Sequence, residues 1–168
     1  EGVGPAAERP ETINMHWGMV TEDNAFGTHE FLGFCETVGA EPYLAGNVGS
    51  GTVEELKDWV EYCNRGSGGD MAAWRERNGR EEPWKVRFWG IGNENWGCGG
   101  HMTPERYAEE FKRYATFVMD YGGARPYRIA CGANADDYNW TEVVMRDVRP
   151  RHLMQGLSLH YYTSTGTW

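Results

Sequence analysis

The chain has 168 residues, of which 40% are hydrophobic and 24% charged, proportions that are ordinary for a soluble globular protein with a hydrophobic core. Its net charge of −9 argues against a nucleic-acid partner and against an anionic membrane surface, because no basic patch is available to neutralise phosphate groups. No stretch of the sequence is long and apolar enough to span a membrane.

The first two predicted helices lie in the N-terminal half. One begins at Thr28 and stops at Gly39. Its predicted apolar face comprises Phe31, Phe34, Cys35 and Val38. The other begins at Thr52, where a T-x-x-E capping box extends to Glu55. Its predicted apolar stripe comprises Val53, Leu56, Val60 and Cys63.

Two further helices are predicted in the C-terminal half. One begins with Thr103 as the cap and Pro104 at the first helical position, and continues to Gly122. Its predicted apolar face comprises Tyr107, Phe111, Tyr114, Val118 and Tyr121. The other covers residues 139–148. The polar connection 64–85 contains a short predicted helix at residues 71–77.

Four short apolar runs are predicted to be strands. They cover residues 42–47, 86–92, 128–134 and 156–162, and each ends in polar or glycine-rich residues. Their alternation with helices predicts an α/β fold with a parallel sheet, in which the loops after the strand C-termini carry the active site. We therefore expect one end of the sheet to hold the polar tips Asn47, Glu94, Asn134 and Tyr162.

The cysteines are widely spaced and form no CxxC or Cys/His pattern. We expect Cys35, Cys63 and Cys131 to be buried and unpaired, and Cys98 to be the most accessible. Reduced thiols favour a cytoplasmic protein. The first residues carry neither an initiator Met nor a signal-peptide pattern, so the chain looks internal and secretion stays open. The sequence has no metal-ligand cluster, phosphate-binding loop or dinucleotide fingerprint, and we expect neither metal nor cofactor.

The segment RFWGIGNENWGCGG, residues 87–100, carries the chemistry. An apolar strand ends there, and Asn93 and Glu94 follow at its C-terminal tip. Glycosidic cleavage needs a carboxylic acid to protonate the leaving oxygen and a second carboxylate to attack the anomeric carbon. The structural alternative is that Glu94 is a solvated loop residue that caps a turn.

The blocks around this segment resemble a known family. Strand-Gly-Asn-Glu resembles the acid/base signature at the end of the fourth strand in retaining (β/α)8 glycosidases. The sequence WGIGNENWGCGGHMTPERYAEEFKRYATFV is similar to the α-L-arabinofuranosidases of glycoside hydrolase family 51. The resemblance continues in GVGPAAERP, in HWGMVTEDNAFGTHEFLGFCETVGAEPYLAGNVGSGTVEELKDWVEYCN and in LSLHYY, and it covers nearly the whole chain in the family's order.

This resemblance implies a role for each matching residue. Glu94 is the expected catalytic acid/base, and Asn93 is expected to contact the arabinose. His160 and Tyr162 match a His-x-Tyr pair on the sixth barrel strand, close to the nucleophile. Trp17 matches an aromatic residue near the substrate, in the loop after the second strand.

Plainer interpretations of these matches stay open. Trp17 could be an ordinary buried loop anchor, and His160 with Tyr162 a satisfied core pair. Asn24 and Asn47 match family positions near the same strand ends, without a firm role.

The resemblance implies that residues 1–168 are an internal fragment of a catalytic barrel. A complete barrel typically needs about 250 residues. We expect a partial (β/α)8 TIM barrel, roughly strands 3 to 6 with their helices, from which the first two strands, the last two strands and a C-terminal β-sandwich are absent. The family's nucleophile, a Glu at the end of the seventh strand, would lie outside the chain. Glu22, Asp136 and Asp137 lie near strand ends but do not match it.

The implied activity is the release of terminal non-reducing α-L-arabinofuranosyl residues from arabinan, arabinoxylan or arabino-oligosaccharides. The fragment alone is expected to be inactive, and the full-length protein could be a homo-oligomer, as the family often is. One alternative is another retaining (β/α)8 glycosidase, such as a β-glycanase or β-xylosidase. Another is a noncatalytic carbohydrate-binding barrel remnant that uses the 8 Trp and 9 Tyr residues to hold glycans.

Overall fold

The main sheet has parallel strands in the order β3-β4-β5-β6, which confirms the predicted parallel α/β arrangement. The computed structural model describes residues 1–163. The strands of the sheet are β3 (Tyr43–Gly46), β4 (Phe88–Ile91), β5 (Tyr127–Ala130) and β6 (Gly156–Leu157). A separate antiparallel hairpin consists of β1 (Thr12–Asn14) and β2 (Val20–Glu22).

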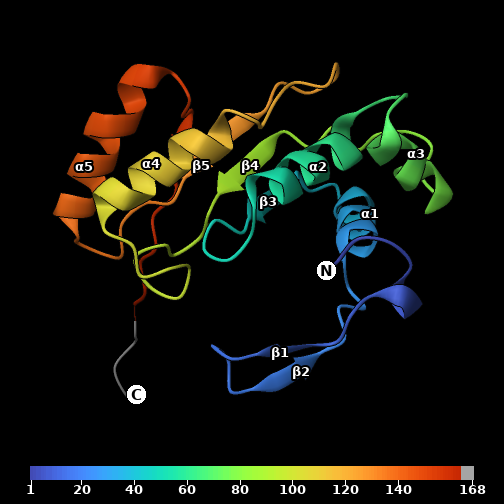
Figure 1. Ribbon diagram of the computed structural model, residues 1–168, viewed down its shortest axis with the longest axis horizontal. Helices are drawn as coiled ribbons and strands as arrows, with labels where there is room; N and C mark the ends of the chain where they lie inside the picture. Colours follow the sequence, from blue (N-terminus) through green and yellow to red (C-terminus); the bar gives the residue numbers. More distant parts are fainter. Residues whose placement is uncertain (164–168) are drawn as a thin grey trace.

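Helices alternate with the strands along the chain. The α-helices are α1 (Thr28–Val38), α2 (Val53–Asn64), α3 (Asp70–Arg77), α4 (Pro104–Ala115) and α5 (Tyr138–Val148). Short 3-10 helices are η1 (Ala6–Glu8) and η2 (Arg149–Arg151). Figure 1 shows α2 and α4 lying over the same face of the sheet, with α5 beside α4. Each of these α-helices overlaps a predicted one.

Parallel register places the C-terminal ends of all four strands at one edge of the sheet. Ile91 of β4 is opposite Gly46 of β3 and Ala130 of β5. Farther along, Asn134 and His160 form an isolated parallel bridge. The prediction that Asn47, Glu94, Asn134 and Tyr162 lie at the same end of the sheet is therefore confirmed. The last two predicted strands, 128–134 and 156–162, pair over shorter lengths than predicted, because only this bridge continues the pairing of β5 with β6.

The helical face of the sheet holds the core. Leu44, Trp89 and Ile91 are buried there under α2 and α4. The ring of Trp89 meets the ring of Trp59 edge to face, with centroids 5.5 Å apart. Successive strand residues point to opposite faces, so the residues between these belong to the other side.

That other face has no helix over it among the described residues. It carries Tyr43, which is exposed, and the half-buried rings of Phe88 and Tyr127, whose centroids are 5.5 Å apart. Gly90 lies between them, and a Cβ there would come within 2.2 Å of the Tyr43 hydroxyl oxygen. A sheet covered by helices on one face only is the arrangement of one wall of a βα barrel.

Local capping follows the sequence signals. The Oγ1 of Thr52 accepts a hydrogen bond from the backbone N–H of Glu55 (3.2 Å), and the Glu55 carboxylate accepts one from the Thr52 N–H (2.7 Å). Thr103 caps α4 in the same way by accepting from the N–H of Arg106 (3.2 Å). These bonds satisfy N–H groups that have no partner within the helix.

The predicted C-terminal end of the α4 helix is wrong. The helix ends at Ala115 and does not reach Gly122. The Thr116 hydroxyl donates to the Lys112 carbonyl (2.7 Å), a bond that bends or ends helices. The Asp120 carboxylate then accepts from the Gly122 N–H (2.8 Å), so the chain turns instead of continuing the helix.

The predicted apolar face of α1 is also partly wrong. Phe34 and Val38 are exposed, whereas Thr28, Leu32 and Cys35 are buried. An indole N–H of α2 donates to the Thr28 hydroxyl (3.0 Å), which turns this side of α1 towards its neighbour. Helical period alone does not decide which of two overlapping apolar stripes is covered.

The hairpin was not predicted. Its strands have only three residues each, and β2 is exposed throughout, so no alternation of buried and exposed residues marks it in the sequence. Figure 1 shows the hairpin standing apart from the main sheet. Its exposed apolar side chains are Ile13, Met15, Trp17, Met19 and Val20.

Candidate active site

The loop that follows β4 has a defined conformation held by its own backbone. The carbonyl of Glu94 accepts hydrogen bonds from the N–H groups of Gly97 (2.8 Å) and Gly99 (3.0 Å). Gly99 approaches the backbone so closely that a Cβ there would lie 1.9 Å from the Asn93 carbonyl oxygen. Glu94 itself has a φ of 47°, in the left-handed region that non-glycine residues rarely adopt. The glycines of this segment therefore allow a tight turn that displays Glu94.

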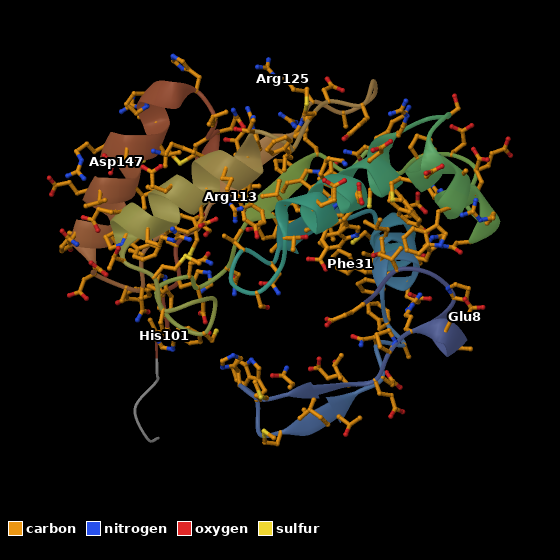
Figure 2. All side chains as sticks on the ribbon, viewed as in Figure 1. Glu8, Phe31, His101, Arg113, Arg125 and Asp147 are labelled. Atoms are coloured by element: carbon orange, nitrogen blue, oxygen red, sulfur yellow. The ribbon has the colours of Figure 1, made fainter. Side chains whose placement is uncertain are left out.

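Asn95 fills the inside of this loop. Its side chain is fully buried, and its amide donates to the Gly99 carbonyl (2.8 Å). A Cβ on Gly92 would lie 2.1 Å from the Asn95 Oδ1, so the strand can only end here on a glycine, whose φ is 89°. The Met102 N–H bonds the Asn95 carbonyl (2.7 Å) and closes the loop. Figure 2 shows His101 on this loop.

Both oxygens of the Glu94 carboxylate have polar partners. The Nδ1 of His160 lies 2.8 Å from Oε1. The thiol of Cys98 donates to Oε2 at 3.3 Å. The side chains of Glu94 and His160 retain 18% and 22% of their exposure, so the pair is partly shielded but reachable from solvent.

Trp96 connects the loops after three strands. Its indole N–H donates to the Gly132 carbonyl beyond β5 (3.0 Å), and its ring meets the edge of the His160 ring at a centroid distance of 6.0 Å. Gly132 is itself tightly enclosed, since a Cβ there would lie 1.5 Å from the Ser158 carbonyl oxygen. Trp96 and Cys98 were not predicted as site residues; both lie in the NENWGCGG block, but their spacing does not reveal what they contact.

Two thiols near Glu94 have raised pKa values for different reasons. The hydrogen bond to the Glu94 carboxylate raises the pKa of Cys98, with a smaller contribution from burial. Burial raises the pKa of Cys131, which follows β5, to about 11. Both thiols therefore stay protonated at neutral pH, which argues against either acting as a nucleophile.

The other predicted site residues, Asn93, Tyr162 and Trp17, are all exposed to solvent. Asn93 is exposed directly beside Glu94. Tyr162 is 83% exposed, two residues after His160, so it is not a buried core residue. Trp17 is 70% exposed in the turn of the β1–β2 hairpin, which contradicts the alternative of a buried anchor. The structure thus brings Glu94 and His160 into contact and leaves both aromatic rings uncovered.

Asn24 and Asn47 make local structural contacts. The Asn24 amide donates to the Pro10 carbonyl (2.7 Å) and closes the base of the hairpin. The Asn47 Oδ1 accepts from the Ser50 N–H (3.0 Å), forming a turn after β3.

Within the described part of the chain, no second carboxylate is hydrogen-bonded to the Glu94 cluster. Glu22 accepts from the Asn14 amide (2.8 Å) in the hairpin. Asp137 caps α5 by accepting from the Trp140 N–H (3.0 Å). These acidic side chains have structural partners of their own.

A cavity lies elsewhere in the molecule. A space of about 720 Å³ runs along the free edge of β3, and Phe31, Leu44 and Trp59 are among its lining residues. Glu94 does not line it. Across residues 1–163 we find no group of three or more His, Cys, Asp and Glu side chains suited to holding a metal ion. The helices of this part of the chain are also too short or too polar to cross a bilayer.

Known proteins match this chain over nearly its whole length. A family model described as the alpha-L-arabinofuranosidase 1 domain matches residues 1–165. The intracellular exo-alpha-L-arabinofuranosidase of Bacteroides ovatus is 54% identical over 166 residues, which are 99% of this chain and 32% of that protein. The chain thus spans about a third of the length of this curated relative.

Solved structures give the same result. The GH51 arabinofuranosidase of Xanthomonas axonopodis pv. citri superposes with a TM-score of 0.93 at 48% identity, over 99% of this chain and 34% of that one. The alpha-L-arabinofuranosidase of Thermotoga maritima, solved as an arabinose complex, superposes with a TM-score of 0.88 at 36% identity, with the same coverage.

Proposed function

Because the chain belongs to the α-L-arabinofuranosidases of glycoside hydrolase family 51, we propose that it is the part of a retaining glycosidase that supplies the catalytic acid/base, Glu94. The fold is a partial (β/α)8 barrel in which β3 to β6 are roughly the third to sixth strands. We infer that the remaining strands and a C-terminal β-sandwich belong to the longer protein, since the relatives are about three times as long as this chain.

The observation that carries this proposal is the setting of the Glu94 carboxylate. It lies at the C-terminal edge of a parallel sheet, partly shielded, with a hydrogen-bonding partner on each oxygen. In a retaining mechanism the protonated acid gives its proton to the leaving oxygen. The resulting carboxylate then takes a proton from the water that attacks the glycosyl-enzyme. A rigid loop with access to solvent suits both steps.

The neighbouring residues support substrate binding at this edge. Asn93 is exposed next to Glu94, where its amide can hydrogen-bond a sugar hydroxyl. Tyr162 presents an uncovered ring of the kind that packs on the apolar face of a sugar, and Trp17 presents another on the separate hairpin. His160 contacts Glu94 directly and can hold the carboxyl group in place.

The nucleophile would come from outside this chain. A retaining mechanism requires two carboxylates about 5–5.5 Å apart. The other acidic residues near strand ends have local partners or, like Asp136, lie on the exposed surface. The family resemblance implies that this nucleophile is a Glu at the end of the seventh barrel strand.

The proposed substrates are arabinan, arabinoxylan and arabino-oligosaccharides, from which terminal non-reducing α-L-arabinofuranosyl residues would be released. The names of the relatives favour this activity over a β-glycanase or β-xylosidase. The name of the Bacteroides ovatus relative also supports the expected cytoplasmic localisation. Assembly of the full-length protein into a homo-oligomer is part of the same proposal.

The test is Glu94→Gln in the full-length protein. Turnover of arabino-oligosaccharides should fall by about 10²–10⁴-fold, because their poor leaving groups depend on protonation. Activated aryl arabinofuranosides should still form the glycosyl-enzyme, and azide should restore turnover by giving a glycosyl azide with retained configuration. Glu109→Gln, on the exposed face of α4, is the matched control and should behave as wild type. Wild-type hydrolysis of arabino-oligosaccharides by Glu94→Gln would refute the assignment.

A further inference from the structure

The thiol of Cys98 lies against the Glu94 oxygen that His160 leaves free. His160 contacts Oε1 (2.8 Å) and Cys98 contacts Oε2 (3.3 Å). We propose that Cys98 is a positioning residue that holds the acid/base carboxyl group from the side opposite His160, an inference that rests on the proposed role of Glu94.

The backbone fixes Cys98 relative to Glu94. Its two neighbours, Gly97 and Gly99, both donate their N–H groups to the Glu94 carbonyl (2.8 Å and 3.0 Å). Gly99 can approach this closely only because it has no Cβ. The thiol is therefore carried on a short, hydrogen-bonded turn that begins at the residue it contacts, and these bonds hold the Cys98 backbone close to Glu94.

The chemistry of the pair sets the direction of the hydrogen bond. An ionised carboxylate can only accept, so the thiol must donate its proton. The carboxylate beside it keeps the pKa of Cys98 above its usual value, and the S–H group is retained at neutral pH. A thiol is a weak donor, which lets Glu94 exchange this contact for the leaving oxygen of the substrate.

The groups that face Glu94 come from three segments. Cys98 belongs to its own loop, His160 follows β6, and the buried thiol of Cys131 follows β5. Cys131 has its own acceptor, the Gly132 carbonyl at 3.6 Å. Cys98 is therefore the thiol whose proton is directed at the carboxylate.

A positioning role predicts a specific kinetic pattern in the full-length protein. Cys98→Ala should lower kcat/KM for arabino-oligosaccharides by about 2- to 10-fold, the usual effect of losing one hydrogen bond. Activated aryl arabinofuranosides should be affected little, because they need no acid in the first step. The alkaline limb of kcat/KM should move to higher pH, since the carboxylate loses a donor that stabilises its ionised form.

Cys98→Ser is the conservative variant, because its hydroxyl keeps a donor at the same place. It should restore the leaving-group dependence of the wild type. Cys35→Ala removes a thiol on α1 and is the control for thiol loss elsewhere. Equal losses with both classes of substrate, or an unmoved alkaline limb in Cys98→Ala, would overturn the positioning role. If Cys98→Ala fails these tests while Glu94→Gln shows its expected defect, only the role of Cys98 is refuted and the proposed function stands. If Glu94→Gln has wild-type activity, the proposed function itself is refuted.

Discussion

The Nδ1 of His160 and the Oε1 of Glu94 lie 2.8 Å apart, although 66 positions separate the two residues in the sequence. The contact joins the loop after β4 to the segment after β6, across the intervening strand β5. Trp96 lies beside it and bonds the backbone beyond β5. One arrangement of three neighbouring strand ends therefore orients the proposed acid/base.

Removing the imidazole should weaken catalysis without unfolding the protein. Hydrogen bonds to charged groups contribute about 1.5–3 kcal/mol, so His160→Ala should lower kcat/KM by roughly 10- to 150-fold. The measurement is steady-state hydrolysis of arabino-oligosaccharides by the full-length protein, because their poor leaving groups depend on the Glu94 proton. His152→Asn is the control, because His152 has a φ of 57°, a conformation that Asn tolerates. A His160→Ala variant with wild-type kcat/KM would show that the contact has no catalytic consequence.

Tyr107 should matter for stability rather than for chemistry. Its buried hydroxyl donates to the Ile91 carbonyl (2.5 Å) and accepts from the Cys131 N–H (2.6 Å), and so joins the ends of β4 and β5. Tyr107→Phe leaves two buried backbone groups without a partner, at about 1–3 kcal/mol each. The thermal midpoint of the full-length protein should fall by about 1 °C per kcal/mol, because the entropy of unfolding grows with chain length. Tyr121→Phe, at a half-buried ring, should change it much less, and equal midpoints for both variants would contradict this account.

The four thiols should react with an alkylating reagent in a defined order. Cys98 is exposed, whereas Cys35, Cys63 and Cys131 are buried, and all four are free, as the sequence predicted. Burial also raises the pKa values of Cys63 and Cys131, the latter to about 11, which lowers their thiolate fraction at neutral pH. Mass spectrometry of the native protein after brief labelling should find the label on Cys98. Labelling of Cys63 before Cys98 would show that the fold opens readily.

The 168-residue chain expressed alone should aggregate and show no sustained turnover. The edges of β3 and β6 are unpaired among the described residues, and the face with Tyr43 and Phe88 has no covering layer. Without a second carboxylate, acid catalysis contributes only about 10²–10⁴-fold. The test of this prediction is to purify the 168-residue chain and the full-length protein and to assay both on an aryl α-L-arabinofuranoside. Turnover by the short chain that Glu94→Gln abolishes would mean that one of its own carboxylates is the nucleophile.

Much of the local structure follows from the sequence alone. The caps at Thr52 and Thr103 and the helices that they begin depend on hydrogen bonds within a few residues. The position of Glu94 at the tip of a strand can likewise be predicted from the sequence, because an apolar run ends there and a polar, glycine-rich loop follows. Parallel pairing follows from the alternation of these strands with helices.

The order of the elements, and the end of the sheet at which the site lies, could thus be predicted from the amino-acid sequence. The contacts of His160 and Cys98 with the two oxygens of Glu94, and the exposure of Phe34 and Val38, became visible only in the folded chain. The same holds for the exposed ring of Trp17 on the hairpin. Helical period and capping act over one turn of chain. The contacts with Glu94 depend instead on strand register and on a left-handed residue in a tight loop, and neither leaves a periodic pattern in the sequence.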